Sequence, residues 1–152
     1  MKEGTALRAS GPENMGVLGF PHAQVGQTYR FAFPPFVNGT GVKLVVEGVK
    51  LTKVPKGVKV IGYPVYSVND TNGYIMGSQD GRKYPRDMTK MPNYAGKPIT
   101  VGPHKKSDRY AMVEARVIGR VQQHLGGCEV TYSQNGKRYR QTLRCEFALD
   151  MK

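Results

Sequence analysis

The chain has 152 residues, 39% of them hydrophobic, which is enough for one domain with a buried core and argues against wholesale disorder. Its 19 Gly and 10 Pro disfavour long helices, and no apolar run in the sequence is long enough to cross a membrane as a helix. The formal charge of +12 favours anionic partners, among them nucleic acid, anionic lipid headgroups and acidic cell-wall polymers.

The pattern along the chain predicts a leader followed by one domain. Residues 1–26 are rich in Gly, Pro and small polar residues and predict an extended leader, whose apolar residues touch a sheet edge. Residues 27–152 predict a single β-sandwich domain. Alternation of apolar and polar residues predicts half-buried strands, separated by Gly/Pro turns, at 28–33, 42–51, 58–63, 99–101, 109–118 and 128–149.

Two features interrupt this alternation. The apolar positions change parity at Glu47-Gly48, which indicates a bulge. Residues 69–98 have no sustained period and predict one long irregular loop, of the kind that is usually functional or disordered. The fold class that follows is all-β, an immunoglobulin-like antiparallel β-sandwich of about seven or eight strands.

The two cysteines of the chain, Cys128 and Cys145, flank Asn135-Gly136, which is the strongest short hairpin signal. A two-residue loop pairs Gln134 with Lys137 and places both cysteines on the apolar face, displaced by two residues along the strands. Such a diagonal pair lies about 7–8 Å apart, which is marginal for a disulfide. A Cys128–Cys145 bond therefore predicts either a four-residue loop or a bulge.

A disulfide is the favoured interpretation of this pair, because two cysteines on one face of one hairpin are unlikely to meet by chance. The alternatives are two buried free thiols, or a metal site or redox pair, although the sequence has no CxxC and no second His near His124. A disulfide implies an oxidising compartment. The expected location is extracytoplasmic, with the export signal or anchor outside this sequence.

The sequence contains no recognisable catalytic constellation. His22, His104 and His124 fall in predicted loops or turns, and GxSxG, HExxH and P-loop patterns are absent from the sequence. Paired carboxylates that meet only in space would escape such a search. We expect no enzyme activity, no metal site and no cofactor.

Two groups of cations are candidate anion-binding residues. On the last strand, Arg138, Arg140 and Arg144 project from the face opposite the core with Lys137 at the turn, in a stripe able to bind phosphate or carboxylate oxygens. A solvated face that protects an edge strand from aggregation is the simpler interpretation. In the long loop, Arg82, Lys83 and Arg86 surround Tyr84, a candidate stacking residue for single strands or sugars, although such tyrosines often only pack.

Several stretches resemble a known group of proteins. They are 26–31 (GQTYRF), 38–44 (NGTGVKL), 55–63 (PKGVKVIGY), 130–132 (VTY) and 136–139 (GKRY). Together they are similar to exported or membrane-anchored β-sandwich proteins of unknown function from actinobacteria such as streptomycetes. The resemblance implies a cell-envelope location and an N-terminal anchor, and it supplies no catalytic residues.

The leading functional hypothesis is a non-catalytic extracytoplasmic module that engages an anionic or protein partner through a basic surface. That partner is an anionic cell-envelope polymer, a membrane surface or a protein. The alternative is a nucleic-acid-binding β protein using the same cations, which free thiols and a steep salt dependence of DNA affinity would favour. The third hypothesis is a hydrolase of unrecognised type, which requires two carboxylates or a Ser-His pair that meet in space.

Overall fold

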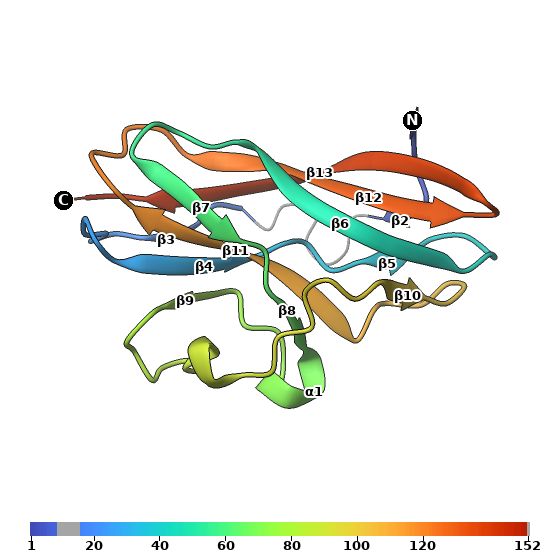
Figure 1. Ribbon diagram of the computed structural model, residues 1–152, viewed down its shortest axis with the longest axis horizontal. Helices are drawn as coiled ribbons and strands as arrows, with labels where there is room; N and C mark the ends of the chain where they lie inside the picture. Colours follow the sequence, from blue (N-terminus) through green and yellow to red (C-terminus); the bar gives the residue numbers. More distant parts are fainter. Residues whose placement is uncertain (9–15, 152) are drawn as a thin grey trace.

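A computed structural model, which describes residues 1–8 and 16–151, shows an all-β antiparallel sandwich, as the sequence predicts (Figure 1). The first sheet has the order β1 (Lys2–Glu3), β13 (Lys137–Leu149), β12 (Leu125–Gln134), β6 (Leu44–Lys53) and β10 (Ile99–Val101), with β3 (Leu18–Phe20) also on β13. The second has the order β7 (Val58–Gly62), β11 (Arg109–Val117), β4 (Thr28–Ala32) and β9 (Gly77–Gln79), with β8 (Val65–Ser67) on β11.

The main core lies between these two sheets. Tyr29 and Phe31 of β4 point inward, together with Phe33 just beyond the strand, and all three side chains are buried as predicted. The ring of Phe31 stacks on that of Phe147 from β13, with centroids 4.8 Å apart, which joins the two sheets at their centre. Side chains at alternate positions of β11, β12 and β13 fill the rest of this layer.

The outer face of the second sheet is buried as well, so the prediction of half-buried strands was wrong for β4 and β11. Ala32, Tyr110 and Met112 lie on this face and pack in a second core with Tyr66, Ile75 and Met88. The segment that covers them is residues 69–98, which forms a third layer below β4 and β11 in Figure 1. Ile75 and Met88 anchor a segment that otherwise shows no apolar period.

This third layer consists of short elements joined by turns. They are α1 (Val68–Thr71) and the 3₁₀ turn η1 (Met88–Lys90), while β9, in the same segment, is an edge strand of the second sheet. The side chain of Ser67 caps α1 by accepting hydrogen bonds from the amides of Asn69 and Asp70. In the described residues, no helix has the length and apolar character needed to cross a membrane.

The expected leader, residues 1–26, contributes strands to the domain. β1 and β3 both run parallel to β13, and β2 (Leu7–Arg8) pairs with β5 (Val37–Asn38) in a small separate sheet. Leu18 and Phe20 pack on the main core, whereas Val17 and Val25 are exposed. The predicted contact with a sheet edge is thus made by the residues of β3.

The bulge predicted in β6 is confirmed by the register with β12. Thr131 pairs with Gly48 and the next residue, Tyr132, pairs with Val46, so Glu47 is the extra residue. The bulge lets the apolar residues on both sides of it face the same core.

The hairpin of β12 and β13 closes through the predicted two-residue turn. Gln134 pairs with Lys137, and the two turn residues have the positive φ values of a type I′ turn, 52° at Asn135 and 74° at Gly136. The four-residue loop proposed as one way to form the disulfide is therefore wrong.

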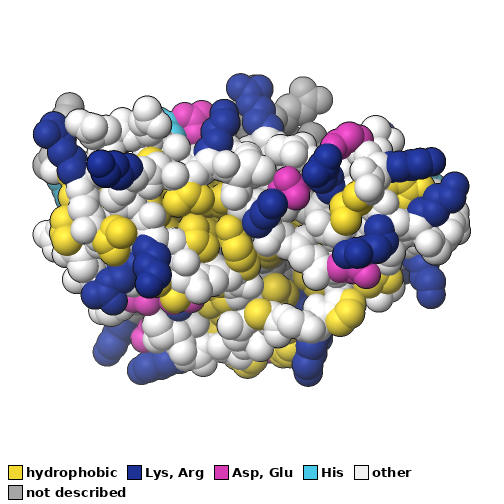
Figure 2. Space-filling model, turned by 45° about the horizontal axis from the view of Figure 1, so that its top comes forward, with side chains coloured by type: hydrophobic (Ala, Val, Ile, Leu, Met, Phe, Trp, Pro, Cys, Tyr) yellow, Lys and Arg dark blue, Asp and Glu magenta, His cyan; other side chains and the backbone are white. Residues whose placement is uncertain are grey.

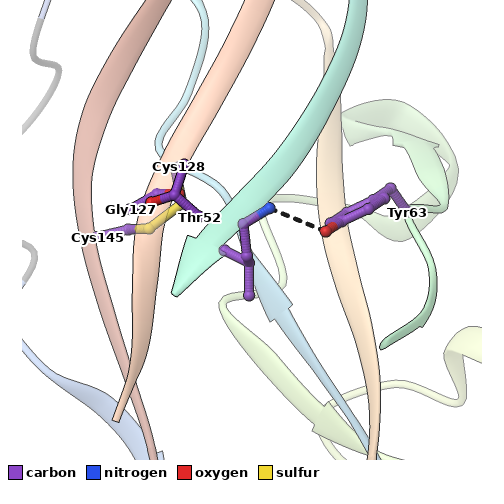
Figure 3. The surroundings of a disulfide bond; sticks show 6 residues. Thr52, Tyr63, Gly127, Cys128 and Cys145 are labelled. Atoms are coloured by element: carbon purple, nitrogen blue, oxygen red, sulfur yellow. Dashed lines mark hydrogen bonds between the residues drawn. A yellow bond between two sulfur atoms is a disulfide. The ribbon is translucent and has the colours of Figure 1, made fainter. Parts of the chain in front are cut away.

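The disulfide forms through the other predicted route, a bulge (Figure 3). Cys128 pairs with Leu143, but the register then shifts, so that Gly126 pairs with Glu146 and two β13 residues, Arg144 and Cys145, lie opposite the single residue Gly127. The shift brings the Cα atoms of Cys128 and Cys145 to 5.8 Å, within the usual range for a disulfide. Gly127 has φ +70°, and a Cβ atom there would lie 1.8 Å from Thr52 Oγ1. The bond indicates an oxidising, extracytoplasmic environment.

Candidate anion-binding surfaces

The first candidate surface is the β13 stripe, which we define as Lys137, Arg138, Arg140 and Arg144. All four side chains are exposed: Arg138, Arg140 and Arg144 at alternate positions of β13, and Lys137 directly after the turn. On the face drawn in Figure 2, Lys and Arg side chains are spread out, with Asp and Glu side chains beside several of them.

Acidic side chains from distant parts of the sequence pair with two members of the stripe. Arg138 Nε donates to Glu47 Oε1 at 3.1 Å, and Arg140 Nε donates to Glu3 Oε1 at 2.9 Å. The hydrogen bond and the charge of Glu3 raise the pKa of Arg140 further above its ordinary value. These exposed pairs add little stability, but their carboxylates neutralise positive charge that would otherwise attract an anionic ligand.

The second candidate surface is the 82–86 loop, which consists of Arg82, Lys83, Tyr84, Pro85 and Arg86. It follows β9 and precedes η1 in the third layer. The side chain of Tyr84 is 88% exposed, and Arg82 and Lys83 are also exposed. Within residues 1–8 and 16–151 these two cations form no ion pair. The loop thus presents unneutralised positive charge beside an aromatic ring in solvent.

A cleft of about 420 Å³ lies beside this loop, and its lining includes residues of β3 and β9. Its lining includes Phe20 and Tyr84 together with Pro21, His22, Gln24, Ser78, Gln79, Arg82 and Pro85. The hydroxyl oxygen of Ser78 is buried and has no hydrogen-bond partner in the described part of the chain. The cleft combines aromatic and proline walls with amide groups and one guanidinium, a composition suited to a polar or anionic ligand with an apolar part.

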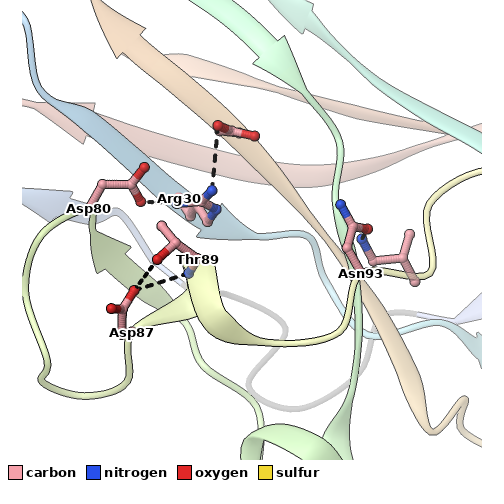
Figure 4. A network of polar contacts seen from close by, with 7 residues as sticks. Arg30, Asp80, Asp87, Thr89 and Asn93 are labelled. Atoms are coloured by element: carbon pink, nitrogen blue, oxygen red, sulfur yellow. Dashed lines mark hydrogen bonds and ion pairs between the residues drawn. The ribbon is translucent and has the colours of Figure 1, made fainter.

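A buried polar network attaches the third layer to the second sheet (Figure 4). Arg30 on β4 is only 6% exposed and forms ion pairs with Asp80, which directly follows β9, and with Glu114 on β11, the latter at 3.4 Å. The pKa of the neighbouring Tyr66 phenol is raised, because the effect of burial exceeds the lowering effect of the positive charge of Arg30. The network holds the start of the 82–86 loop in place.

Two further polar residues fix the other end of this segment. Asp87 accepts hydrogen bonds from the amide and the hydroxyl of Thr89, and these bonds lower the pKa of its carboxyl group. Asn93 Oδ1 accepts from the amide of Val65 on β8 at 3.0 Å and from the amide of Ala95 at 2.9 Å. The segment that contains the 82–86 loop is therefore held to the second sheet by the Arg30–Asp80 ion pair before the loop and by the Asn93–Val65 hydrogen bond after it.

In the described residues, no group of three or more His, Cys, Asp or Glu side chains is placed to hold a metal ion. The side chain of His124 pairs with that of Glu146 on the surface. His22 lines the cleft, and its backbone forms an isolated antiparallel β-bridge with Met151. Of the cleft residues, sequence reasoning had identified Arg82 and Tyr84, while the walls formed by residues 20–24 and 78–79 were missed.

Comparisons with known proteins give no family for this chain. No protein-family model and no curated protein matches the sequence. Among solved structures, the VesB protease of Vibrio cholerae matches over 86% of this chain and 29% of that protease, with 14% identity and a TM-score of 0.37. The chain thus spans less than a third of that protein, and a match of this quality carries no functional argument. The resemblance to actinobacterial envelope proteins stays a prediction.

Proposed function

We propose that this protein is a non-catalytic extracytoplasmic binding module that engages an anionic partner through the 82–86 loop. The observation that carries the proposal is the contrast between the two cationic surfaces. In the stripe, Arg138 and Arg140 already have acidic partners, although Lys137 and Arg144 have none in the described residues. Arg82 and Lys83 have none there either, and they lie beside an exposed tyrosine at a cleft. The proposal moves the main binding surface from the β13 stripe to this loop.

The physical chemistry of the loop supports this proposal. Guanidinium groups bind carboxylate or phosphate oxygens through paired hydrogen bonds, and an aromatic ring in solvent gains about 1 kcal/mol or more when an apolar or planar group covers it. The net charge of +12 attracts any polyanion over long range, so it accelerates encounter without choosing the site. Specific contacts at the loop would then distinguish one partner from another.

Binding measurements with matched charge removals test the proposal. The Arg82→Ala/Lys83→Ala and Arg138→Ala/Arg140→Ala variants each lose two positive charges, so they change the long-range field equally. The probes are polyglutamate, polygalacturonate, phosphatidylglycerol vesicles and duplex DNA, each at about 0.05 and about 0.2 M salt.

We expect the loop variant to lose about tenfold or more in affinity for a carboxylate probe, and the stripe variant to lose about threefold or less. Equal losses would show that only net charge matters and would contradict the proposal. Preferential binding of DNA with a steep salt dependence would favour the nucleic-acid alternative instead.

The finer location, secreted or anchored at the cell surface, rests on the disulfide and is also part of the proposal. Alkylation of the denatured protein, purified without reductant, should leave the intact mass unchanged because both thiols are in the disulfide. Alkylation of both cysteines in a folded protein would remove the main support for an exported module.

A further inference from the structure

The strand β9 forms an unpaired edge of the second sheet, because in the described residues it pairs only with β4. The register places Arg30 opposite Ser78. On either side of this pair, the Ala32 amide donates a hydrogen bond to the Met76 carbonyl, and the Asp80 amide donates one to the Thr28 carbonyl. In an antiparallel ladder, hydrogen-bonded and non-hydrogen-bonded pairs alternate. Ser78 is therefore bonded into the sheet, while the backbone groups of Gly77 and Gln79 point away from it.

Most of these outward backbone groups have no partner in the described part of the chain. The carbonyl of Gln79 accepts a hydrogen bond from the Arg82 amide at 3.2 Å and is thereby used in the turn. The amide and carbonyl of Gly77 and the amide of Gln79 remain open. This alternation of donor, acceptor and donor is what a neighbouring strand requires.

The cleft lies directly against this edge. Ser78 and Gln79 of β9 belong to its lining, together with Phe20, Pro21 and Tyr84. Three residues of an extended chain span about 10 Å, the length of β9, and their side chains alternate between the two sides of the new strand. One side would meet the aromatic and proline walls, and the other would meet the cations of the 82–86 loop.

The charge of the protein restricts what fits here. A second copy of this chain would bring another +12 against Arg82 and Lys83, which disfavours pairing between two β9 edges. A folded acidic surface could reach the cations but not the backbone groups within the cleft. An extended segment with acidic side chains satisfies both the open amides and the unneutralised cations.

We propose that β9 takes an extended acidic peptide segment as an added strand, with main-chain hydrogen bonds to Gly77 and Gln79 and carboxylates on Arg82 and Lys83. This inference rests on the proposed function, since it assigns the partner of the same loop. It goes further by naming the binding mode, in which the peptide backbone supplies part of the affinity.

Two N-methylated isomers of one peptide, compared with the parent peptide, test the added-strand binding mode on the unmodified protein. The parent probe is the blocked peptide Glu-Val-Glu-Thr-Glu-Val, and the two controls carry N-methyl groups on alternate amides, in one phase or the other. All three have the same side chains and charge. Because alternate amides of an added strand point toward β9, we expect one methylated isomer to bind like the parent and the other to lose about tenfold or more in affinity.

Two protein variants test the same contact from the other side. Gln79→Pro removes an amide that points into the cleft, so the variant should fold and lose about threefold to tenfold in peptide affinity. Ser78→Pro removes an amide bonded to β4 and should instead lower the melting temperature. If Gln79→Pro does not fold, the methylated peptides on the unmodified protein decide the question.

The outcomes separate this inference from the proposed function. Equal binding of the parent and both methylated peptides, or no saturable binding of the parent peptide, overturns the added strand even when polyglutamate binding depends on Arg82 and Lys83. Peptide and polyglutamate binding that is unchanged by Arg82→Ala/Lys83→Ala overturns the proposed function as well.

Discussion

Replacement of Gly127 by alanine tests a specific local claim of the structure, that the β12 position opposite the β13 bulge at Arg144 and Cys145 requires a glycine. Gly127 has φ +70°, and a Cβ atom there would lie 1.8 Å from Thr52 Oγ1 and 3.2 Å from Thr52 Cβ. The hydroxyl of Thr52 also donates to the Gly127 carbonyl at 3.2 Å. The substitution therefore adds backbone strain and displaces a bonded side chain.

The two effects can be given separate magnitudes. A positive φ costs a residue with a Cβ about 1–2 kcal/mol, and loss of the exposed Thr52 hydrogen bond costs about 0.5–1 kcal/mol. We expect Gly127→Ala to lower the free energy of unfolding by about 2–3 kcal/mol. In a Thr52→Ala background the same change should cost only about 1–2 kcal/mol, because the displaced hydroxyl is already gone.

Urea denaturation of the oxidised protein measures these free energies. Gly136→Ala is the matched control for backbone strain alone, since Gly136 has φ +74° and open space around it. Gly48→Ala, at a position with neither positive φ nor a neighbour within 4 Å, should stay within about 0.5 kcal/mol of the unmodified protein. A Gly127→Ala cost no larger than that of Gly136→Ala, unchanged by Thr52→Ala, would refute the steric argument.

Three further predictions concern the disulfide, the third layer and a buried phenol. Loss of the disulfide through Cys128→Ala/Cys145→Ser opens a loop closed across a sequence separation of 17 and should cost about 3 kcal/mol, or about 6–12 °C in melting temperature by calorimetry; a loss under about 1 kcal/mol would contradict this. Met112→Ala should cost about 2–5 kcal/mol in urea, because the side chain is fully buried on the outer face of β11; a near-neutral result would show that residues 69–98 do not cover that face. Burial raises the pKa of Tyr74 from 10.0 to about 12, so the folded state retains a proton that the unfolded state loses, and stability should fall as pH rises from about 10 to about 12; Tyr74→Phe should flatten this fall in pH-dependent denaturation, and an unchanged slope would argue against it.

The sequence predicted the elements whose signals are local. Period-two alternation located the main strands, Glu47 marked the bulge of β6, and Asn135-Gly136 marked the turn of the hairpin. The disulfide followed from the same alternation, but the choice between a longer loop and a bulge could not be made. That choice depends on an extra residue in β13, where Arg144 and Cys145 lie opposite Gly127, and a bulge at these two residues has no local signature in the sequence.

The failures come from contacts between distant residues. Alternation identified one apolar face of β4 and β11, and the outward Ala32, Tyr110 and Met112 were the available sign that the second face is also covered. Nothing in the sequence places Glu3 or Glu47 beside the β13 stripe, because those pairs join residues more than 90 positions apart. The cleft likewise arises where the end of β3 meets β9, a strand too short and too polar to show a period.

The parallel pairing of β1 and β3 with β13 has a mechanical consequence. Lys2 lies opposite Tyr139 near the hairpin turn, whereas the C-terminal end of the chain leaves from the opposite end of the same sheet (Figure 1). Tension applied between the two ends of the domain would pull β1 and β13 along their common axis in opposite directions. The hydrogen bonds between them would then bear the load together, in shear, instead of opening one after another as in a peeled hairpin.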